Sequence, residues 1–390
     1  MAPVDRIDPE ELSVTLADVG ADGWLIYDFH NLNPVAARLI GYKGMVTRRL
    51  FLWLPASGHP TCIASVIDTN AVEHISAEVS YYTTWQQLHG LLEKAVGGKR
   101  AAMEVSTENA VPYLDRVPVG VVALLTKFGV SVMPSDKLVT QFASCWSADE
   151  LTAHRDASES IARIANDILR SVVDEVGSAS EYQVQQRVVE AMTRAGLEIE
   201  DPPIVGFGPN SANPHYDASA DSSLVLESDQ VILLDLFGKK DGIAWADQTW
   251  MAFSGGAPPD EVVSVWEATR DARDAAVERL ARATAAGDTI TGAVLDDAAR
   301  ELLRDRGYAD WFKHRTGHSI DGDLHGSGPY LDNFETNDTR TLLPGVVFSI
   351  EPGVYLTGRF GMRSEINVIL TEEGPEVTPR VPQTELILSS

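Results

Sequence analysis

Acidic residues set inside apolar stretches are the first feature of this sequence that could do chemistry. Asp235 interrupts the apolar run 231–237, and Asp247 lies in the next strand-like run, 243–253. A buried carboxylate without compensation costs several kcal/mol. Each aspartate therefore needs a positive partner, donated hydrogen bonds or a metal ion.

A hairpin would bring these two aspartates together. Asp241-Gly242 between the runs is typical of a hairpin turn, and the alternation that starts at Ile243 places Asp247 on the face that also carries Thr249. Antiparallel pairing then directs Asp235 and Asp247 toward one cavity. Two like charges repel there unless a cation lies between them or each finds a backbone or arginine donor.

Two glutamates repeat the same anomaly farther along the chain. Glu351 ends the apolar run 346–350, and Glu365 opens the run 366–370. Arg363 lies two residues before Glu365 and hence on its face. A simple ion pair with Arg363 is therefore an alternative explanation of Glu365.

A histidine cluster lies between the two pairs of carboxylates. The chain has only nine histidines, yet His314, His318 and His325 are close in sequence. Glycines around them allow the backbone to approach a site closely. They are Gly317, Gly322, Gly326 and Gly328. Because imidazole binds metals and also moves protons near neutral pH, the cluster favours a functional site.

Four strand carboxylates and one histidine form a set of hard oxygen ligands with one nitrogen. Such a set suits two divalent ions that share bridging carboxylates, with manganese, cobalt, zinc or iron as candidates. The chain has two cysteines, Cys62 and Cys145. These are too few for a cysteine-based structural zinc site or a disulfide framework.

The surrounding pattern predicts the elements that would position these residues. Short β-rich runs and helices alternate over 24–133, which is typical of an α/β domain with a mostly parallel or mixed sheet. A domain boundary is expected near 142–147. Beyond it, capping pairs predict helices that begin after Ser147 and Ser180. We expect the C-terminal helices, including those over 260–286 and 291–305, to pack on one side of a curved sheet.

Composition excludes several classes of protein. The 390 residues carry 31 basic and 57 acidic side chains, a net charge of −26 that disfavours nucleic acid and anionic membranes as partners. The mean hydropathy is −0.08 and no apolar run approaches the length of a membrane span. With no signal-peptide pattern at the N-terminus, we expect a cytoplasmic protein.

The ordered motifs resemble those of the pita-bread metallopeptidases, the group of aminopeptidase P, Xaa-Pro peptidase, prolidase and creatinase. The resemblance rests on Asp235, Asp247, the run His314-Arg-Thr-Gly-His318, Glu351-Pro-Gly-Val-Tyr355 and Arg363-Ser-Glu365. It implies an α/β (α+β) architecture: a pita-bread catalytic domain over 147–390, preceded by a smaller creatinase-like α/β domain over 1–146. A homodimer is also expected from the family.

The resemblance also implies residue roles. Asp235, Asp247, His318, Glu351 and Glu365 would hold two divalent metal ions, with manganese favoured, and a hydroxide between the ions would attack the scissile carbonyl. Glu351 would accept and donate the proton, while His215 and His325 would stabilise the tetrahedral intermediate. Four further residues would contact the substrate or support the metal ligands. They are His314, Tyr355, Arg363 and Thr249.

Two departures from the family pattern concern arginines. The family commonly continues the second aspartate as Ile-Thr-Arg, whereas Asp247 is followed by Gln248-Thr249-Trp250, so an arginine near the cavity is missing. Prolidases also use an arginine shortly after the third histidine to hold the free carboxylate of a dipeptide. Here 326–339 contains no Arg or Lys, and Arg340 comes first.

The leading interpretation is a metal-dependent exopeptidase that hydrolyses the bond after the N-terminal residue of Xaa-Pro peptides, with dipeptides as possible substrates. An alternative is a metal-dependent hydrolase of a small non-peptide amide or amidine. A further alternative is a non-catalytic peptide-binding module. The retention of the complete ligand set favours an enzyme.

Overall fold

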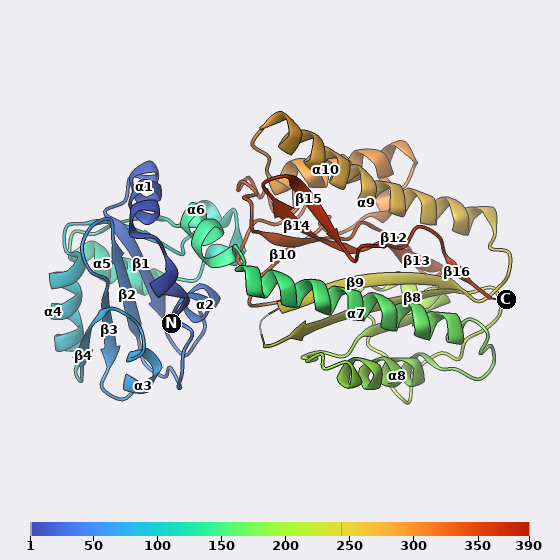
Figure 1. Cartoon of the computed structure of the whole chain (residues 1–390), viewed down its shortest axis with the longest axis horizontal. Helices are drawn as coiled ribbons and strands as arrows, with labels where there is room; N and C mark the ends of the chain where they lie inside the picture. The colour runs from blue at the N-terminus through green and yellow to red at the C-terminus, as the bar shows by residue number, and fades with distance from the viewer. Residues whose placement is uncertain (1, 243, 390) are drawn as a thin grey trace. The chain divides into compact units, whose positions relative to one another are not determined.

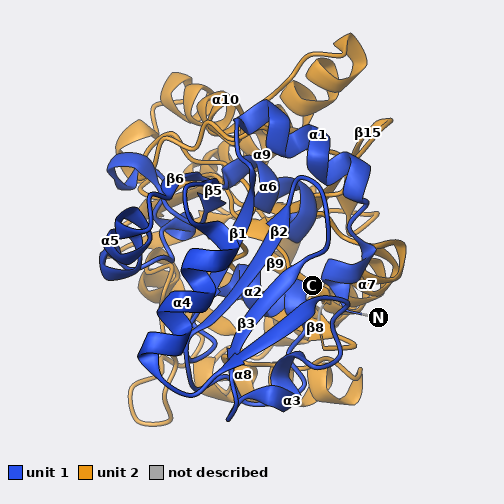
Figure 2. Cartoon of the chain, turned by 90° about the vertical axis from the view of Figure 1, so that its left-hand side faces the viewer, with its two compact units in different colours: residues 1–144 blue, residues 145–390 orange. Residues whose placement is uncertain are grey.

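A computed structural model describes residues 2–242 and 244–389. These residues divide into two compact units, Met1–Ser144 and Cys145–Ser390, which Figure 2 colours separately. The sequence placed the boundary just beyond this point, after Trp146. Assignment of the units as creatinase-like and catalytic domains stays a prediction.

The first unit is a three-layer α/β structure. Its sheet has the strand order β4-β3-β2-β1-β5-β6, with antiparallel pairing around β2 and parallel pairing elsewhere. The strands are β1 (Gly23–Asp28), β2 (Leu50–Pro55), β3 (Thr61–Ser65), β4 (Glu78–Tyr82), β5 (Arg100–Met103) and β6 (Ser131–Pro134). The mixed sheet expected from the alternation over 24–133 is present. Its edge strand β4 has mostly exposed or half-buried side chains.

Helices cover both faces of this sheet. One face packs in an apolar cluster with α1 (Pro9–Val19), α2 (Pro34–Ile40), α3 (Thr69–Val72) and α6 (Asp136–Leu138). The opposite face packs with α4 (Trp85–Val96) and α5 (Val119–Lys127). Alternation along each strand produces this arrangement, because successive side chains point to opposite faces.

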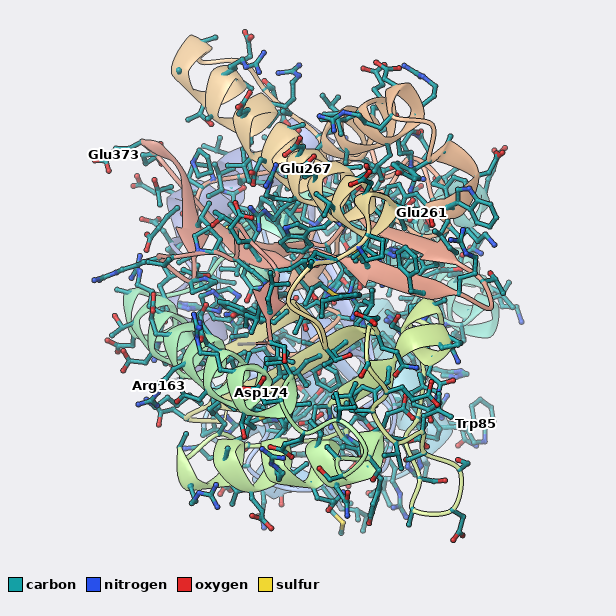
Figure 3. The ribbon with its side chains drawn as sticks, turned by 90° about the vertical axis from the view of Figure 1, so that its right-hand side faces the viewer. Trp85, Arg163, Asp174, Glu261, Glu267 and Glu373 are labelled. Atoms are coloured by element: carbon teal, nitrogen blue, oxygen red, sulfur yellow. The ribbon has the colours of Figure 1, made fainter. Side chains whose placement is uncertain are left out.

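Two helices of the second unit begin at the capping residues predicted from the sequence. Ser147 with Glu150, and Ser180 with Gln183, form the predicted capping boxes of α7 (Ala148–Val172) and α8 (Glu181–Arg194). α9 (Asp260–Ala286) and α10 (Gly292–Asp305) follow a strand pair. The outer surfaces of α7 and α9 carry charged side chains such as Arg163 and Glu267 (Figure 3).

The strands of the second unit form separate ladders. Their orders are β16-β9-β8-β7, β10-β11-β14-β15 and β12-β13. The strands are β7 (Ile204–Phe207), β8 (Val231–Lys240), β9 (Ala244–Phe253), β10 (Ser319–Ile320), β11 (Val347–Ile350), β12 (Gly353–Leu356), β13 (Phe360–Arg363), β14 (Ile366–Thr371), β15 (Gly374–Thr378) and β16 (Ile387–Leu388). The hairpin between β8 and β9 was predicted; Ile243 at its turn lies outside the described residues.

Each helix pair covers the outer face of a different ladder. α7 and α8 pack on β7, β8 and β9, whereas α9 and α10 pack on β11 and β14 (Figure 1). The expectation of helices on one side of a single curved sheet is therefore replaced by two helix-covered ladders. The opposite face of the β8-β9 hairpin is apolar at Val231, Leu233, Met251 and Phe253, where it packs with α9 and α10, and it carries Asp235 and Asp247 farther along the strands. Within the described residues, no helix is long and apolar enough to cross a membrane.

Candidate metal centre

Strand register places the two aspartates on one face of the β8-β9 hairpin. Asp235 pairs with Thr249, and Phe237 pairs with Asp247. Odd-numbered residues of both strands therefore share a face, with the aspartates as diagonal neighbours. Even-numbered neighbours such as Leu234 and Leu236 pack against α7 and α8 on the other face.

The β10-β11 ladder presents the histidine and the first glutamate. His318 directly precedes β10, and Glu351 directly follows β11. Ser349 fixes both, because its backbone N–H donates to the His318 carbonyl and its hydroxyl donates to Glu351 Oε1 at 3.2 Å. Gly317 is needed for this approach, since a Cβ there would lie 2.0 Å from the Ser349 carbonyl oxygen.

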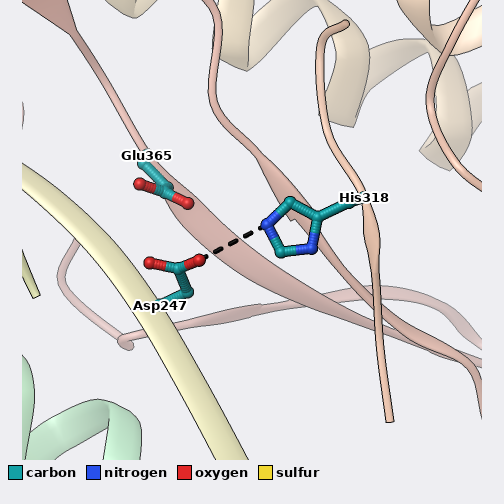
Figure 4. Close-up of side chains that lie close together, drawn as sticks. All are labelled: Asp247, His318 and Glu365. Carbon is teal, nitrogen blue, oxygen red and sulfur yellow. Dashed lines mark ion pairs between the residues drawn. The ribbon is translucent and has the colours of Figure 1, made fainter. Parts of the chain in front are cut away.

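These elements bring Asp247, His318 and Glu365 together (Figure 4). One potential ligand atom from each lies within 4.8 Å of the others. His318 Nε2 is 3.4 Å from Asp247 Oδ2 and 3.5 Å from Glu351 Oε1. Since His318 Nδ1 lies 3.1 Å from the Ser319 carbonyl, Nδ1 carries the hydrogen and Nε2 offers its lone pair to the site.

Electrostatics and hydrogen bonding both indicate that a cation belongs among these carboxylates. Burial raises the pKa of Asp235, and burial together with the neighbouring carboxylates raises the pKa of Asp247 and of Glu365 well above the usual value. Asp235 Oδ1 and Glu365 Oε1 are buried without a hydrogen-bond partner. Unpaired carboxylate oxygens beside a neutral imidazole are the donor set that divalent metal ions bind, so the residues fit a metal centre.

Arg363 compensates only part of this negative charge. Its Nη2 forms an ion pair with Asp235 Oδ2, and its Nε donates to the Thr249 hydroxyl at 2.6 Å. Thr249 in turn donates to Glu365 Oε2 at 2.6 Å, whereas Arg363 Nε is 3.7 Å from that oxygen. The simple Arg363–Glu365 pair considered from the sequence is thus a longer contact than the pair with Asp235.

His314 and Tyr355 form a hydrogen-bonded pair beside the carboxylates. His314 Nδ1 is 2.7 Å from the Arg315 carbonyl, so it donates there and Nε2 accepts from the Tyr355 hydroxyl at 2.9 Å. Burial lowers the pKa of His314 to about 4. Gly353 permits this arrangement, because a Cβ there would lie 2.4 Å from the Tyr355 hydroxyl.

A cavity of about 600 Å³ opens over the cluster. Its lining includes the five predicted ligands and also His215, His314, His325, Arg315 and Arg363. The rings of His318 and His325 are 4.3 Å apart between centroids. The nearby His318, followed by burial, lowers the pKa of His325 to about 3, so this imidazole is neutral near pH 7.

The structure explains the two arginine departures. Trp250, at the position where the family has arginine, lies on the helix-covered face of β9 with the α7 cluster, so this position does not face the cavity as the sequence analysis supposed. Arg340 is buried and donates to Asp338 and to the carbonyls of Ser327 and Gly328. It is absent from the cavity lining among the described residues.

Comparison with known proteins assigns the chain to a family. The model of metallopeptidase family M24 matches residues 154–372, more than half of the chain. The chain belongs to metallopeptidase family M24. This M24 peptidase is 29% identical over 378 residues to the probable dipeptidase PepE of Mycobacterium bovis, with 95% of this chain and 93% of that protein covered. It is 32% identical over 212 residues to the Xaa-Pro dipeptidase of Lactobacillus helveticus, covering 54% and 52%.

Solved structures show the same fold over the whole M24 chain. Dipeptidase PepE from Mycobacterium ulcerans matches with a TM-score of 0.79 and 27% identity, over 97% of this chain and 96% of that one. A recombinant prolidase from Thermococcus sibiricus matches with a TM-score of 0.72 and 26% identity, over 98% of each chain. The pita-bread fold class predicted from the sequence is therefore confirmed.

Sequence reasoning missed residues that position the candidate ligands. Asn367 of β14 binds both backbone groups of Asp247, and Arg273 of α9 donates to the Ser364 hydroxyl at 2.9 Å, between Arg363 and Glu365. Arg273 is only 1% exposed. The sequence signal for both residues is a polar side chain within an otherwise apolar pattern. Such a pattern does not indicate which group the side chain binds.

Proposed function

We propose that this M24 peptidase is a metal-dependent exopeptidase that hydrolyses the bond after the N-terminal residue of Xaa-Pro peptides. The observation that carries the proposal is the pair of buried, unpartnered oxygens, Asp235 Oδ1 and Glu365 Oε1, beside Asp247 and His318. Relatives named Xaa-Pro dipeptidase and prolidase support the choice of substrate.

We assign the predicted ligands to two divalent ions, with manganese favoured over cobalt, zinc or iron. The ligands are Asp235, Asp247, His318, Glu351 and Glu365. The chemistry that such ions supply when bound is polarisation of the scissile carbonyl and a water of lowered pKa as the source of the hydroxide nucleophile. Ion identity and number are part of the proposal.

The protein's own side chains would then handle protons and the developing negative charge. Glu351, whose Oε1 faces His318 Nε2, is placed to accept the proton of the attacking water and return it to the leaving amine. His325 is neutral at pH 7, so an imidazole N–H remains available to the carbonyl oxygen as charge develops there. His215 lines the same cavity and is assigned the same function.

Two further expectations, one from the family and one from the N-terminal sequence, accompany this proposal without bearing on its chemistry. We carry forward the expectation of a homodimer and of a cytoplasmic location. Sedimentation of the purified chain tests the first expectation, since a monomer at all concentrations contradicts it. Fractionation of cells that produce the chain tests the second.

Hydrolysis assays test the function directly. We expect Ala-Pro and Ala-Pro-Pro to be cleaved by the manganese- or cobalt-loaded protein, and the activity to disappear on chelation and return with metal. Asp247→Asn should abolish cleavage, whereas Asp167→Asn, an exposed change on α7, should not. Activity that is indifferent to both chelation and Asp247→Asn contradicts the proposal. Cleavage of small amides without Xaa-Pro peptides replaces it with the non-peptide alternative.

A further inference from the structure

His215 lies on a loop rather than on one of the strands that carry the carboxylates. The segment 208–223, here called the His215 loop, follows β7 and begins with a short 3₁₀ helix, Gly208–Ala212. His215 is exposed on this loop, and it nevertheless lines the cavity over the carboxylate cluster. Because loops are more mobile than the elements that they connect, the position of this imidazole depends on what holds the loop.

A single buried carboxylate holds both ends of the His215 loop. Glu181 is the first residue of α8 and is fully buried. Its Oε1 accepts from the Phe207 N–H at 2.7 Å, and its Oε2 accepts from the Leu224 N–H at 2.8 Å. The Glu181 N–H also donates to the Leu224 carbonyl at 3.1 Å. The two ends are therefore closed onto one residue, as in a compact Ω-loop.

The same carboxylate binds the middle of the loop. Asn210 Nδ2 lies 3.0 Å from each carboxylate oxygen of Glu181, and the Tyr216 hydroxyl donates to Glu181 Oε2 at 2.7 Å. Tyr216 directly follows His215 in the chain, and the His215 N–H donates to Asn213 Oδ1 at 3.2 Å. The hydrogen bond from Tyr216 to Glu181 therefore fixes the backbone next to the imidazole.

A second contact joins the His215 loop to the strand of Arg363. Ser211 of the loop accepts from the Gly361 N–H at 2.9 Å, and a Cβ at Gly361 would lie 2.4 Å from the Ser211 carbonyl oxygen. Gly361 belongs to β13, which ends at Arg363, and the side chain of Arg363 lines the same cavity as His215. The loop is thus held by α8 and by β13, and a shift of the loop displaces His215 relative to the carboxylate cluster.

We propose that Glu181 is a positioning residue for the reaction, because its carboxylate holds the loop that carries His215. The proposal rests on the function assigned to His215 above, the stabilisation of the tetrahedral intermediate. A hydrogen-bond donor to a developing oxyanion is effective only at the correct position, and a displacement of about 1 Å can cost roughly 100-fold in rate. Glu181 therefore acts on kcat through His215 and does not touch the substrate.

A double-mutant cycle with His215 tests the proposal in the manganese-loaded protein. Glu181→Gln turns one acceptor oxygen into an amide donor that faces the donors of the loop, so it should lower kcat for Ala-Pro-Pro roughly 5- to 50-fold with KM within about 2-fold. In the His215→Ala background, Glu181→Gln should change kcat by less than about 2-fold, because the side chain that it positions is absent. Glu190→Gln, an exposed change on the same helix, is the matched control and should leave kcat unchanged in both backgrounds.

A milder variant covers the case in which Glu181→Gln does not fold. Tyr216→Phe removes one hydrogen bond to Glu181 and should lower kcat roughly 2- to 10-fold, again only while His215 is present. A purely structural role reduces the fraction of active protein, which lowers kcat by the same factor with and without His215. Equal factors in the two backgrounds therefore overturn the proposal.

A measurement without turnover separates this proposal from the function on which it rests. A wild-type protein that cleaves no Xaa-Pro peptide overturns the Xaa-Pro function, and histidine ring signals in the NMR spectrum of the metal-free protein then decide whether Glu181 positions His215. The His215 signal, assigned from its loss in His215→Ala, should shift or broaden in Glu181→Gln and stay in place in Glu190→Gln. An unchanged His215 signal in Glu181→Gln rejects the positioning role.

Discussion

Asn367 binds both backbone groups of Asp247. The Asn367 Oδ1 atom accepts from the Asp247 N–H at 2.9 Å, and Nδ2 donates to the Asp247 carbonyl at 2.8 Å. A side chain of β14 thus takes the place of a neighbouring strand for β9. The two ladders that carry the proposed metal ligands are held together at this point, next to Glu365.

Asn367→Ala should destabilise the protein and weaken metal binding. The change leaves a buried backbone donor and acceptor unpaired, which costs about 2–4 kcal/mol in the free energy of unfolding. Denaturant unfolding and manganese titration measure the two effects. Asn337→Ala, an exposed control, should change the unfolding free energy by less than about 0.5 kcal/mol. Full metal affinity in the destabilised Asn367→Ala protein would show that Asn367 does not position the ligands.

Asp247→Asn should make the metal-free protein more stable while it removes metal binding. The raised pKa values of Asp247 and Glu365 arise from burial and from repulsion by neighbouring carboxylates, and the amide removes the charge that causes both at position 247. We expect the melting temperature in chelator to rise by a few degrees, about 1 kcal/mol. Manganese should raise the melting temperature of wild type but not of the variant. A variant less stable than wild type in chelator contradicts the view that the cluster is strained without a cation.

Arg363→Met should destabilise the metal-free protein more than the metal-loaded protein. Arg363 is the ion-pair partner of Asp235, so its loss leaves a buried carboxylate uncompensated, at a cost of about 3–5 kcal/mol. Bound cations would take over part of the compensation. Unfolding measured in chelator and in manganese gives the two values, and Arg363→Lys should recover part of the loss. Equal destabilisation under both conditions would indicate a purely packing role.

His154 should make stability fall on acidification. It is fully buried between the Trp245 carbonyl and the Thr378 hydroxyl, and burial lowers its pKa from 6.5 to about 4. Below pH 6.5 the unfolded chain takes up a proton that the folded chain refuses. Stability is therefore fully present above pH 6.5 and is lost toward pH 4, by up to about 3 kcal/mol.

The matched variant for this pH effect is His154→Gln. Its unfolding free energy, subtracted from that of wild type at each pH, isolates the contribution of His154 from those of the carboxylates. We expect the difference to shrink between pH 6.5 and 4, and His59→Gln, an exposed change, to show no such trend. A constant difference across this range would mean that His154 is protonated in the folded protein.

The sequence by itself determined which buried side chains need a partner that compensates their charge. A carboxylate within an apolar strand is costly wherever the strand packs, so Asp235, Asp247 and Glu365 stand out without any structure. Helix starts can also be predicted from the sequence, because a capping box such as Ser147 with Glu150 is completed within one helical turn. These features made the helix starts and the fold class predictable, and they are the basis of the proposed ligand set.

Only the tertiary structure decided the partners of those side chains. Arg363 pairs with Asp235, 128 residues away, more closely than with its near neighbour Glu365, and Arg340 is turned into the protein to bind Asp338. Arg315 lines the cavity although it was not singled out from the sequence. Periodicity predicts which side chains of a strand share a face. It does not predict which side chains pack against that face, because this depends on how distant ladders pack. The choice of charge partner is therefore a property of the folded chain.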